Sequence, residues 1–68
     1  MDFKSYLAWY ADKDNARGDF ARDALDDPDF PIDSDYQHQL NYLHFCFACS
    51  EAINAFRQIA KNYRRYIA

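Results

Sequence analysis

The chain contains few glycine and proline residues, which are common in long loops, and no long apolar run of the kind that spans a membrane. Its 68 residues contain a single glycine, Gly18, and only two prolines, Pro28 and Pro31. No apolar run reaches the roughly 18 residues that a membrane-spanning helix needs, and the amphipathic N-terminus lacks the pattern of a signal peptide. Internal repeats and low-complexity segments are absent as well. We therefore expect one domain over residues 1–68 that lies in the cytoplasm and has no membrane partner.

Cysteine is also scarce, and the two that occur form a C-x-x-C motif at Cys46 and Cys49. In redox enzymes this motif opens a helix after a strand, and the sequence predicts no strand. A zinc site that used His38 and His44 as well would place four ligands along one helical run, which cannot converge on a tetrahedral ion. Because both cysteines lie among Phe and Leu residues, we expect core cysteines rather than a redox or metal site.

Aromatic residues are abundant instead, with six Phe, six Tyr and one Trp making up 19% of the chain. A chain this short buries little surface when it folds, and each aromatic ring contributes a large apolar area. Aromatic packing is therefore the expected source of stability. The one tryptophan, Trp9, lies at the edge of an apolar stripe. We expect it to be half-buried, with an exposed anchor for a protein partner as the alternative.

The charges are distributed unevenly around a net charge of −3. Residues 1–35 carry ten acidic and four basic side chains, whereas residues 36–68 carry one acidic and four basic side chains. Such an asymmetry can mark a surface for a charged partner. We favour the alternative that the charges complement the helix dipoles and the opposite half of the chain.

Apolar residues recur at helical spacing along most of the chain. The spacing predicts an all-α compact bundle of four short helices, over residues 2–12, 16–26, 34–49 and 50–66. Ser50 is a good helix cap and the only sign of a break before the last helix, so a continuous helix over residues 34–66 stays open. The core-facing stripe of the last helix consists of Ile53, Phe56, Ala60, Tyr63 and Ile67.

The third predicted helix is apolar on nearly every side from Tyr42 to Cys49. A helix of this kind lies at the centre of a bundle or at an interface, and in so short a chain we favour the centre. If the segment instead forms an interface, Phe45 is one of two candidate protein-binding residues, and Trp9 is the other. The partner would be an unknown protein or a second copy of the chain.

The segment Asp26–Tyr36 joins the second and third helices, and its two prolines and five aspartates flank one large aromatic residue, Phe30. The prolines must end the preceding helix because they lack an N–H donor. We expect Phe30 to insert into the core. Ser34 and Gln37 match a capping box that would start the next helix. The segment lacks the central Gly and terminal Glu of a calcium-binding loop, so we expect no metal there.

A basic stripe follows one side of the last predicted helix and consists of Arg57, Lys61, Arg64 and Arg65. Several bases in a row can follow a phosphate backbone, which is the main source of non-specific affinity for DNA. The alternative, which we favour, is that these cations complement the C-terminal end of the helix dipole.

The sequence offers no catalytic constellation. A nucleophile needs a base held by a third group and donors for an oxyanion, and the serines lie at predicted caps without a Gly-rich elbow. We therefore expect a protein that is not an enzyme and that uses no cofactor, no metal and no small-molecule substrate.

Short motifs are spread along the chain. Phe3-x-x-Tyr6-Leu7-x-x-Tyr10 and Phe20-Ala21 precede Asp27-x-x-Phe30-Pro31 and Asp35-Tyr36-x5-Tyr42-Leu43, and Phe56 and Tyr63 follow. With these motifs the chain resembles the YozE-like family of small proteins from Gram-positive bacteria. The resemblance implies a SAM-like bundle whose last helix is the longest. Its signature residues are Asp27, Phe30, Pro31, Asp35, Tyr36, Tyr42 and Leu43.

The family resemblance implies no established activity, because SAM-like folds serve both protein association and nucleic-acid binding. Our leading hypothesis is a non-catalytic protein-interaction module. The alternative is an accessory protein that binds nucleic acid through the basic stripe.

Overall fold

The computed structural model describes all 68 residues, which form four α-helices and no strand. The helices are α1 (Phe3–Tyr10), α2 (Ala16–Asp26), α3 (Tyr36–Phe45) and α4 (Ser50–Ile67). The predicted all-α bundle is confirmed, and α4 is the longest helix with 18 residues. A turn separates α3 from α4, so the continuous helix that the sequence left open does not form.

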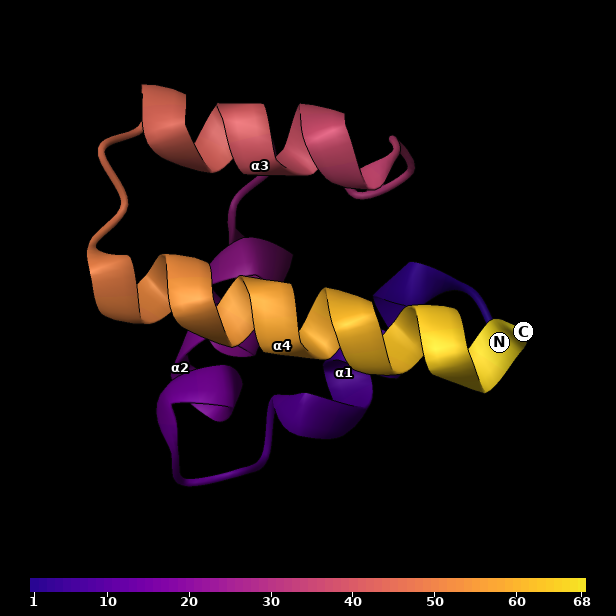
Figure 1. The fold of residues 1–68 in the computed structure, drawn as a ribbon. Coiled ribbons are helices and arrows are strands. Elements are labelled where there is room, and N and C mark those ends of the chain that lie inside the picture. The colour runs from indigo at the N-terminus through magenta and orange to yellow at the C-terminus, as the bar shows by residue number, and fades with distance from the viewer.

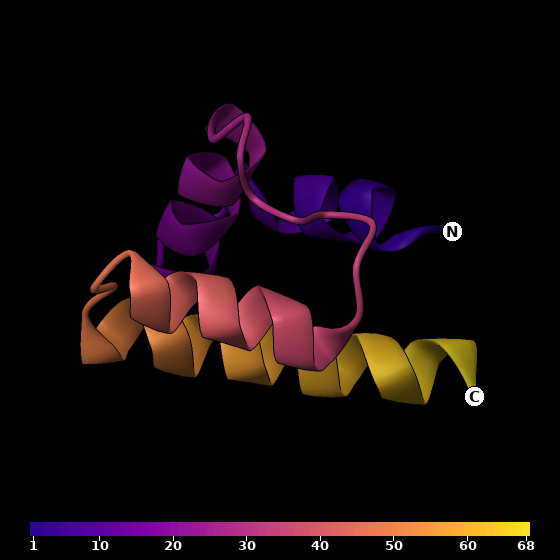
Figure 2. The same ribbon diagram turned by 90° about the horizontal axis from the view of Figure 1, so that it is seen from above.

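The longest helix organises the bundle. α4 packs against each of the other three helices, whereas α3 packs closely against α4 alone. α3 runs antiparallel beside α4 (Figure 1), and Figure 2 shows α1 and α2 lying on the layer that these two helices form. The two termini lie at the same end of α4 (Figure 2), where the Tyr63 hydroxyl donates to the carbonyl oxygen of Met1 at 3.0 Å. The α3–α4 turn lies at the other end (Figure 2).

The core is built mainly from aromatic and aliphatic side chains of α1, α2 and α4. Phe56, Leu7 and Ile59 are the largest side chains that are completely buried. The Phe20 ring lies 5.6 Å from that of Phe56 and 6.1 Å from that of Phe30, measured between ring centroids. Aromatic packing therefore connects α2, α4 and the α2–α3 connection.

The core-facing stripe predicted for the last helix is correct in its middle and wrong at its end. Phe56 and Ala60 are buried as expected, but Ile67 is 57% exposed. The last turn of α4 extends past the start of α3 (Figure 2), so no helix covers Ile67 from that side. Ile59, which the predicted stripe omits, is fully buried.

The α1–α2 connection depends on the only glycine. Asn15 caps α2, its side chain accepting from the Gly18 N–H at 2.9 Å. A Cβ atom at residue 18 would lie 1.9 Å from the carbonyl oxygen of Lys13, because the preceding chain crosses close to α2. The Arg22 side chain donates to the carbonyl oxygens of Ala11 and Lys13 at 2.7 and 3.1 Å. Gly18 therefore permits a close backbone approach that Arg22 holds in place.

Phe30 fixes the α2–α3 connection to the core, as predicted. The side chain is only 6% exposed, and its ring packs edge-on against Phe20 and Tyr42. The Tyr42 hydroxyl donates to Oδ2 of Asp27 at 2.6 Å. This bond ties α3 to the residue that ends α2.

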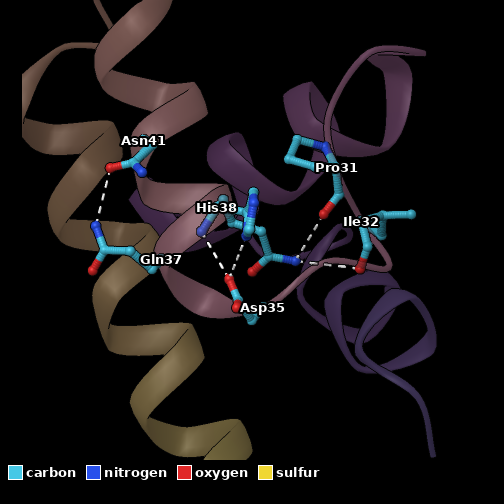
Figure 3. A network of polar contacts seen from close by, with 7 residues as sticks. Pro31, Ile32, Asp35, Gln37, His38 and Asn41 are labelled. Atoms are coloured by element: carbon cyan, nitrogen blue, oxygen red, sulfur yellow. Dashed lines mark hydrogen bonds and ion pairs between the residues drawn. The ribbon is translucent and has the colours of Figure 1, made fainter.

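Figure 3 shows how the end of this connection is held. Gln39, a buried polar residue of α3, donates from Nε2 to the carbonyl oxygens of Pro31 and Ile32, both at 3.2 Å. The predicted capping box is wrong, because Asp35 rather than Ser34 caps α3 and accepts from the His38 N–H at 2.9 Å. The helix therefore begins at Tyr36.

Helix ends differ from the predictions at two further places. α1 ends at Tyr10, two residues before the predicted end, and Asp2 caps its start. The N-cap of α4 is Cys49, which makes no side-chain capping bond, and Ser50 is the first residue of the helix. Capping at Ser50 was therefore wrongly predicted.

Candidate functional site

A tight turn joins α3 to α4, and its backbone is strained at one residue. The N–H of Ala48 donates to the carbonyl oxygen of Leu43, and that of Phe47 to the carbonyl oxygen of His44. This pair of bonds is the Schellman motif that commonly ends helices. It requires a left-handed residue, and Phe47 adopts φ 56°, the only positive φ of a residue other than glycine. Glycine normally occupies this position because it has no Cβ to clash.

The same turn exposes two large rings. Phe45 is 79% exposed and Phe47 is 93% exposed, the two highest values among the large apolar side chains. The prediction that this segment lies at the centre of the bundle is therefore wrong. α3 ends at Phe45, and of its residues only Gln39 and Leu43 are buried. We call the exposed residues of this turn the turn patch: Phe45, Cys46, Phe47 and Cys49.

The cysteines belong to this surface and not to the core. Both Cys46 and Cys49 are free and exposed, which overturns the predicted burial. Their apolar neighbours in sequence do not cover them, because the chain has left the helix and turned outward. Cys46 and Cys49 line one hollow of about 250 Å³, together with Tyr42, Phe30 and other residues.

A second exposed apolar surface lies where the termini meet. Trp9 is 58% exposed, not half-buried as predicted, because α1 directs Leu7 and Tyr10 into the core and leaves Trp9 on its flank. The residues around a shallow hollow of about 230 Å³ are Met1, Tyr6, Trp9 and Tyr66, which we call the terminal patch. The Lys13 ammonium group lies 4.2 Å from the centroid of a Trp9 ring. The two predicted interface residues, Trp9 and Phe45, thus belong to different surfaces.

The four bases of the predicted stripe share the outward side of α4. Arg57, Lys61, Arg64 and Arg65 are all exposed, and we call them the basic face. None is within 4.0 Å of a carboxylate, since the ion pairs join Lys13 to Asp12, Arg22 to Asp19 and His38 to Asp35.

One member of the basic face is linked to the core through aromatic rings. The Arg64 guanidinium lies 5.4 Å from the centroid of the Tyr36 ring. Tyr36 in turn stacks on the buried Phe56 at 5.3 Å and an interplanar angle of 11°. The expected pairing of these cations with the acidic half of the chain is therefore not found, and an aromatic ring supports Arg64 instead.

Two aspartates of the α2–α3 connection, Asp27 and Asp35, make structural hydrogen bonds with their carboxylates. The Tyr42 hydroxyl, followed by the N–H of Asp29, lowers the pKa of Asp27. The backbone N–H and then the ring of His38 lower the pKa of Asp35, and Figure 3 shows both contacts to the Asp35 carboxylate. No group of three or more His, Cys, Asp or Glu residues lies in a position to hold a metal ion.

The signature residues lie together around the α2–α3 connection and α3. Phe30 and Leu43 are buried, and Asp27 binds the hydroxyl of Tyr42. Asp35 caps α3, and Pro31 accepts from Gln39. They hold the fold together, and four of them, Asp27, Phe30, Tyr42 and Leu43, also line the hollow that contains the two cysteines.

Phe47 and Met1 are the surface residues that sequence reasoning missed. Phe47 had no usable signal, because the left-handed position after a helix favours Gly or Asn. Met1 belongs to the terminal patch only because the N-terminus lies beside the C-terminal part of α4, which no local pattern indicates.

No helix of the structure is both long and apolar enough to cross a membrane.

Family models, curated proteins and solved structures provide three comparisons for the chain. No curated protein and no solved structure shows a significant match to the chain. The family model described as the YozE SAM-like fold matches residues 3–65, which is nearly the whole chain. The family is a small SAM-like helical domain without a known catalytic role. The predicted resemblance is therefore confirmed, and the chain belongs to the YozE SAM-like family.

Proposed function

We propose that the chain is a non-catalytic protein-interaction module that binds its partner through the turn patch. The observation that carries the proposal is Phe47, which combines a left-handed backbone with a side chain that is 93% exposed. A residue other than glycine in this conformation costs roughly 1–2 kcal/mol. The exposed ring recovers none of that free energy within the fold.

Strain that the fold does not need is typical of functional positions. Glycine at residue 47 would keep the turn without the strain, so the ring of Phe47 requires another explanation. Binding energy at protein interfaces concentrates in a few aromatic residues that enter a pocket of the partner. Phe45 and Phe47 present two such rings at one end of α4, away from the termini.

The test places a photo-crosslinking side chain, p-benzoylphenylalanine, at residue 47 in cells that express the protein. The matched control carries the same side chain at Tyr66, an exposed aromatic residue of the terminal patch. We expect a discrete adduct from residue 47, weaker by several-fold when Phe45→Ser is added, and no equivalent adduct from residue 66. Mass spectrometry of the adduct distinguishes a second copy from another protein. The absence of an adduct at residue 47 would contradict the proposal.

A second candidate is nucleic-acid binding through the basic face. Two observations support it: the four bases have no acidic partner within the chain, and Arg64 is supported by the ring of Tyr36. Cations that are not neutralised internally remain available to phosphates. The opposite charge of residues 1–35 would favour a single orientation on a polyanion.

The corresponding test is a DNA titration at several salt concentrations. The affinity should fall steeply between roughly 50 and 200 mM salt, and Arg57→Ala should reduce the slope of that dependence by about one. Lys4→Ala, a change of charge on α1, is the control and should have a smaller effect. Absence of binding at low salt would eliminate this candidate.

The cytoplasm is the location that we propose for either activity. Two exposed free thiols support it, because thiols stay reduced in that compartment.

A further inference from the structure

Two thiols share one small part of the surface. Cys46 and Cys49 are both free, both exposed, and both line the hollow beside Tyr42 and Phe30. The acidic residues of that hollow are Asp23 and Asp27, and it contains no basic residue. A second thiol three positions away makes this site different from a single surface cysteine.

Both thiols lie at the ends of helices. Cys46 is the C-cap of α3 and Cys49 is the N-cap of α4, so neither lies inside a helix. Cys49 makes no capping hydrogen bond with its side chain. The intervening Phe47 has a positive φ, which reverses the direction of the chain between the two cysteines.

We propose that Cys46 and Cys49 are a dithiol that closes reversibly to an intramolecular disulfide. The co-reactant is a low-molecular-weight disulfide such as oxidised glutathione. One cysteine attacks a sulfur of that disulfide as the thiolate, forms a mixed disulfide and releases one small thiol. The second cysteine then attacks the protein sulfur of the mixed disulfide and releases the other small thiol. The protein is oxidised by two electrons and loses two protons, and the small disulfide is reduced to two thiols.

Ring closure would take place around Phe47, the residue at the tip of the turn patch. The proposal concerns the thiols alone and goes beyond the protein-interaction function. Its test uses no binding partner, so a failure of one proposal leaves the other standing.

The experiment incubates the reduced chain with glutathione disulfide and follows the products by intact mass spectrometry. The wild-type chain should lose the mass of two hydrogen atoms and remain a monomer, without accumulating a mixed disulfide. Cys46→Ser and Cys49→Ser each retain one thiol, and each should accumulate a single glutathionyl group. Circular dichroism establishes that both variants keep the helical content of the wild type. Dithiothreitol should restore the starting mass of all three proteins.

A second measurement tests whether the folded structure holds the two thiols close together. At equilibrium, the ratio of ring-closed to mixed-disulfide product, multiplied by the concentration of free glutathione, gives the effective concentration of one thiol at the other. We expect this ratio to be several-fold higher for the folded chain than for the same chain in concentrated guanidinium chloride. Wild-type protein that carries two glutathionyl groups, or that forms disulfide-linked dimers, would overturn the proposal. So would a ratio that is lower in the folded chain than in the unfolded one.

Discussion

The two connections that flank α3 each contain a prominent phenylalanine, and they place it in opposite environments. Phe30, in the α2–α3 connection, is 6% exposed, whereas Phe47, in the α3–α4 turn, is 93% exposed. The first connection is long enough to fold back over the core, and Gln39 and Tyr42 hold it there. The second is a tight Schellman turn that leaves Phe47 exposed, although Ala48 packs against the core.

The comparison shows that neighbouring residues in the sequence do not decide the environment of an aromatic side chain. Phe30 lies among aspartates and is buried, whereas Phe47 lies among apolar residues and is solvated. Chain length and backbone hydrogen bonds between the helix ends decide it. One connection therefore contributes to the stability of the fold, and the other is available for binding.

The largest effect is expected from Phe30→Ala. Removing a ring packed against Phe20 and Tyr42 leaves a cavity, and the free energy of unfolding should fall by roughly 3–5 kcal/mol. Phe47→Ala is the matched control and should change it by less than about 0.5 kcal/mol. Urea unfolding followed by circular dichroism measures both. A loss below about 1 kcal/mol for Phe30→Ala would remove the contrast between the two connections.

Gln39→Ala should weaken the attachment of the α2–α3 connection to α3. The carbonyl oxygens of Pro31 and Ile32 would lose their donor, and we expect a loss of roughly 1–3 kcal/mol in the free energy of unfolding. Gln37→Ala is the control, because Gln37 is exposed and bonds only to Asn41. Equal losses for the two variants would show that the buried amide does not hold the connection.

Phe47→Gly should act in the opposite direction and stabilise the fold. Relief of the left-handed strain is offset in part by the greater freedom of glycine in the unfolded chain, which leaves a gain of about 0.5–1 kcal/mol. The same change should abolish partner binding through the turn patch. A photo-crosslinking side chain at residue 45 can detect this loss. A variant that is destabilised would contradict the assignment of strain to this residue.

The smallest effect is a change in the pH dependence of stability on Tyr42→Phe. The Tyr42 hydroxyl is the main cause of the lowered pKa of Asp27, whose ordinary value is 3.8. The stability from this carboxylate is complete above pH 3.8 and is lost as the pH falls through the lowered folded value. In Tyr42→Phe, the loss of thermal stability below pH 3.8 should therefore be shallower than in the wild type.

Tyr36→Phe is the control for this comparison, because its hydroxyl makes no side-chain hydrogen bond to Asp27 and its ring is retained. Thermal midpoints measured at neutral pH and at several acidic values give the two profiles. Parallel profiles for the wild type and Tyr42→Phe would show that the hydroxyl does not couple the α2–α3 connection to pH.

The fold could be predicted because the sequence features that set the helix bounds act locally along the chain. The bounds of α2 agree with the predicted range, since an Asn cap starts it and Pro28 follows its end. The insertion of Phe30 into the core could also be predicted, because a lone large aromatic residue in an ordered connection has few other places to go. Hydrophobic spacing and proline positions act over one or two turns of helix, within the reach of sequence analysis.

The candidate surfaces could be predicted only in part. The basic face followed from helical spacing, and the structure exposes all four of its members. The burial of Cys46 and Cys49 was predicted wrongly, because their apolar neighbours gave no sign that α3 ends at Phe45. The close approach at Gly18 and the strain at Phe47 arise from backbone segments that meet in space, and spacing along the sequence does not report them.

The position of Trp9 has a consequence for spectroscopy. It is the only tryptophan in the chain, and it is 58% exposed in the terminal patch, beside Met1 and Tyr66. Its fluorescence in the native state should already be that of a largely hydrated indole, so unfolding should shift the emission maximum only slightly. A ligand that covers the terminal patch should move the emission to shorter wavelength, whereas a partner on the turn patch should leave it unchanged. The intrinsic fluorescence of the unmodified protein therefore reports which end of α4 a bound molecule occupies.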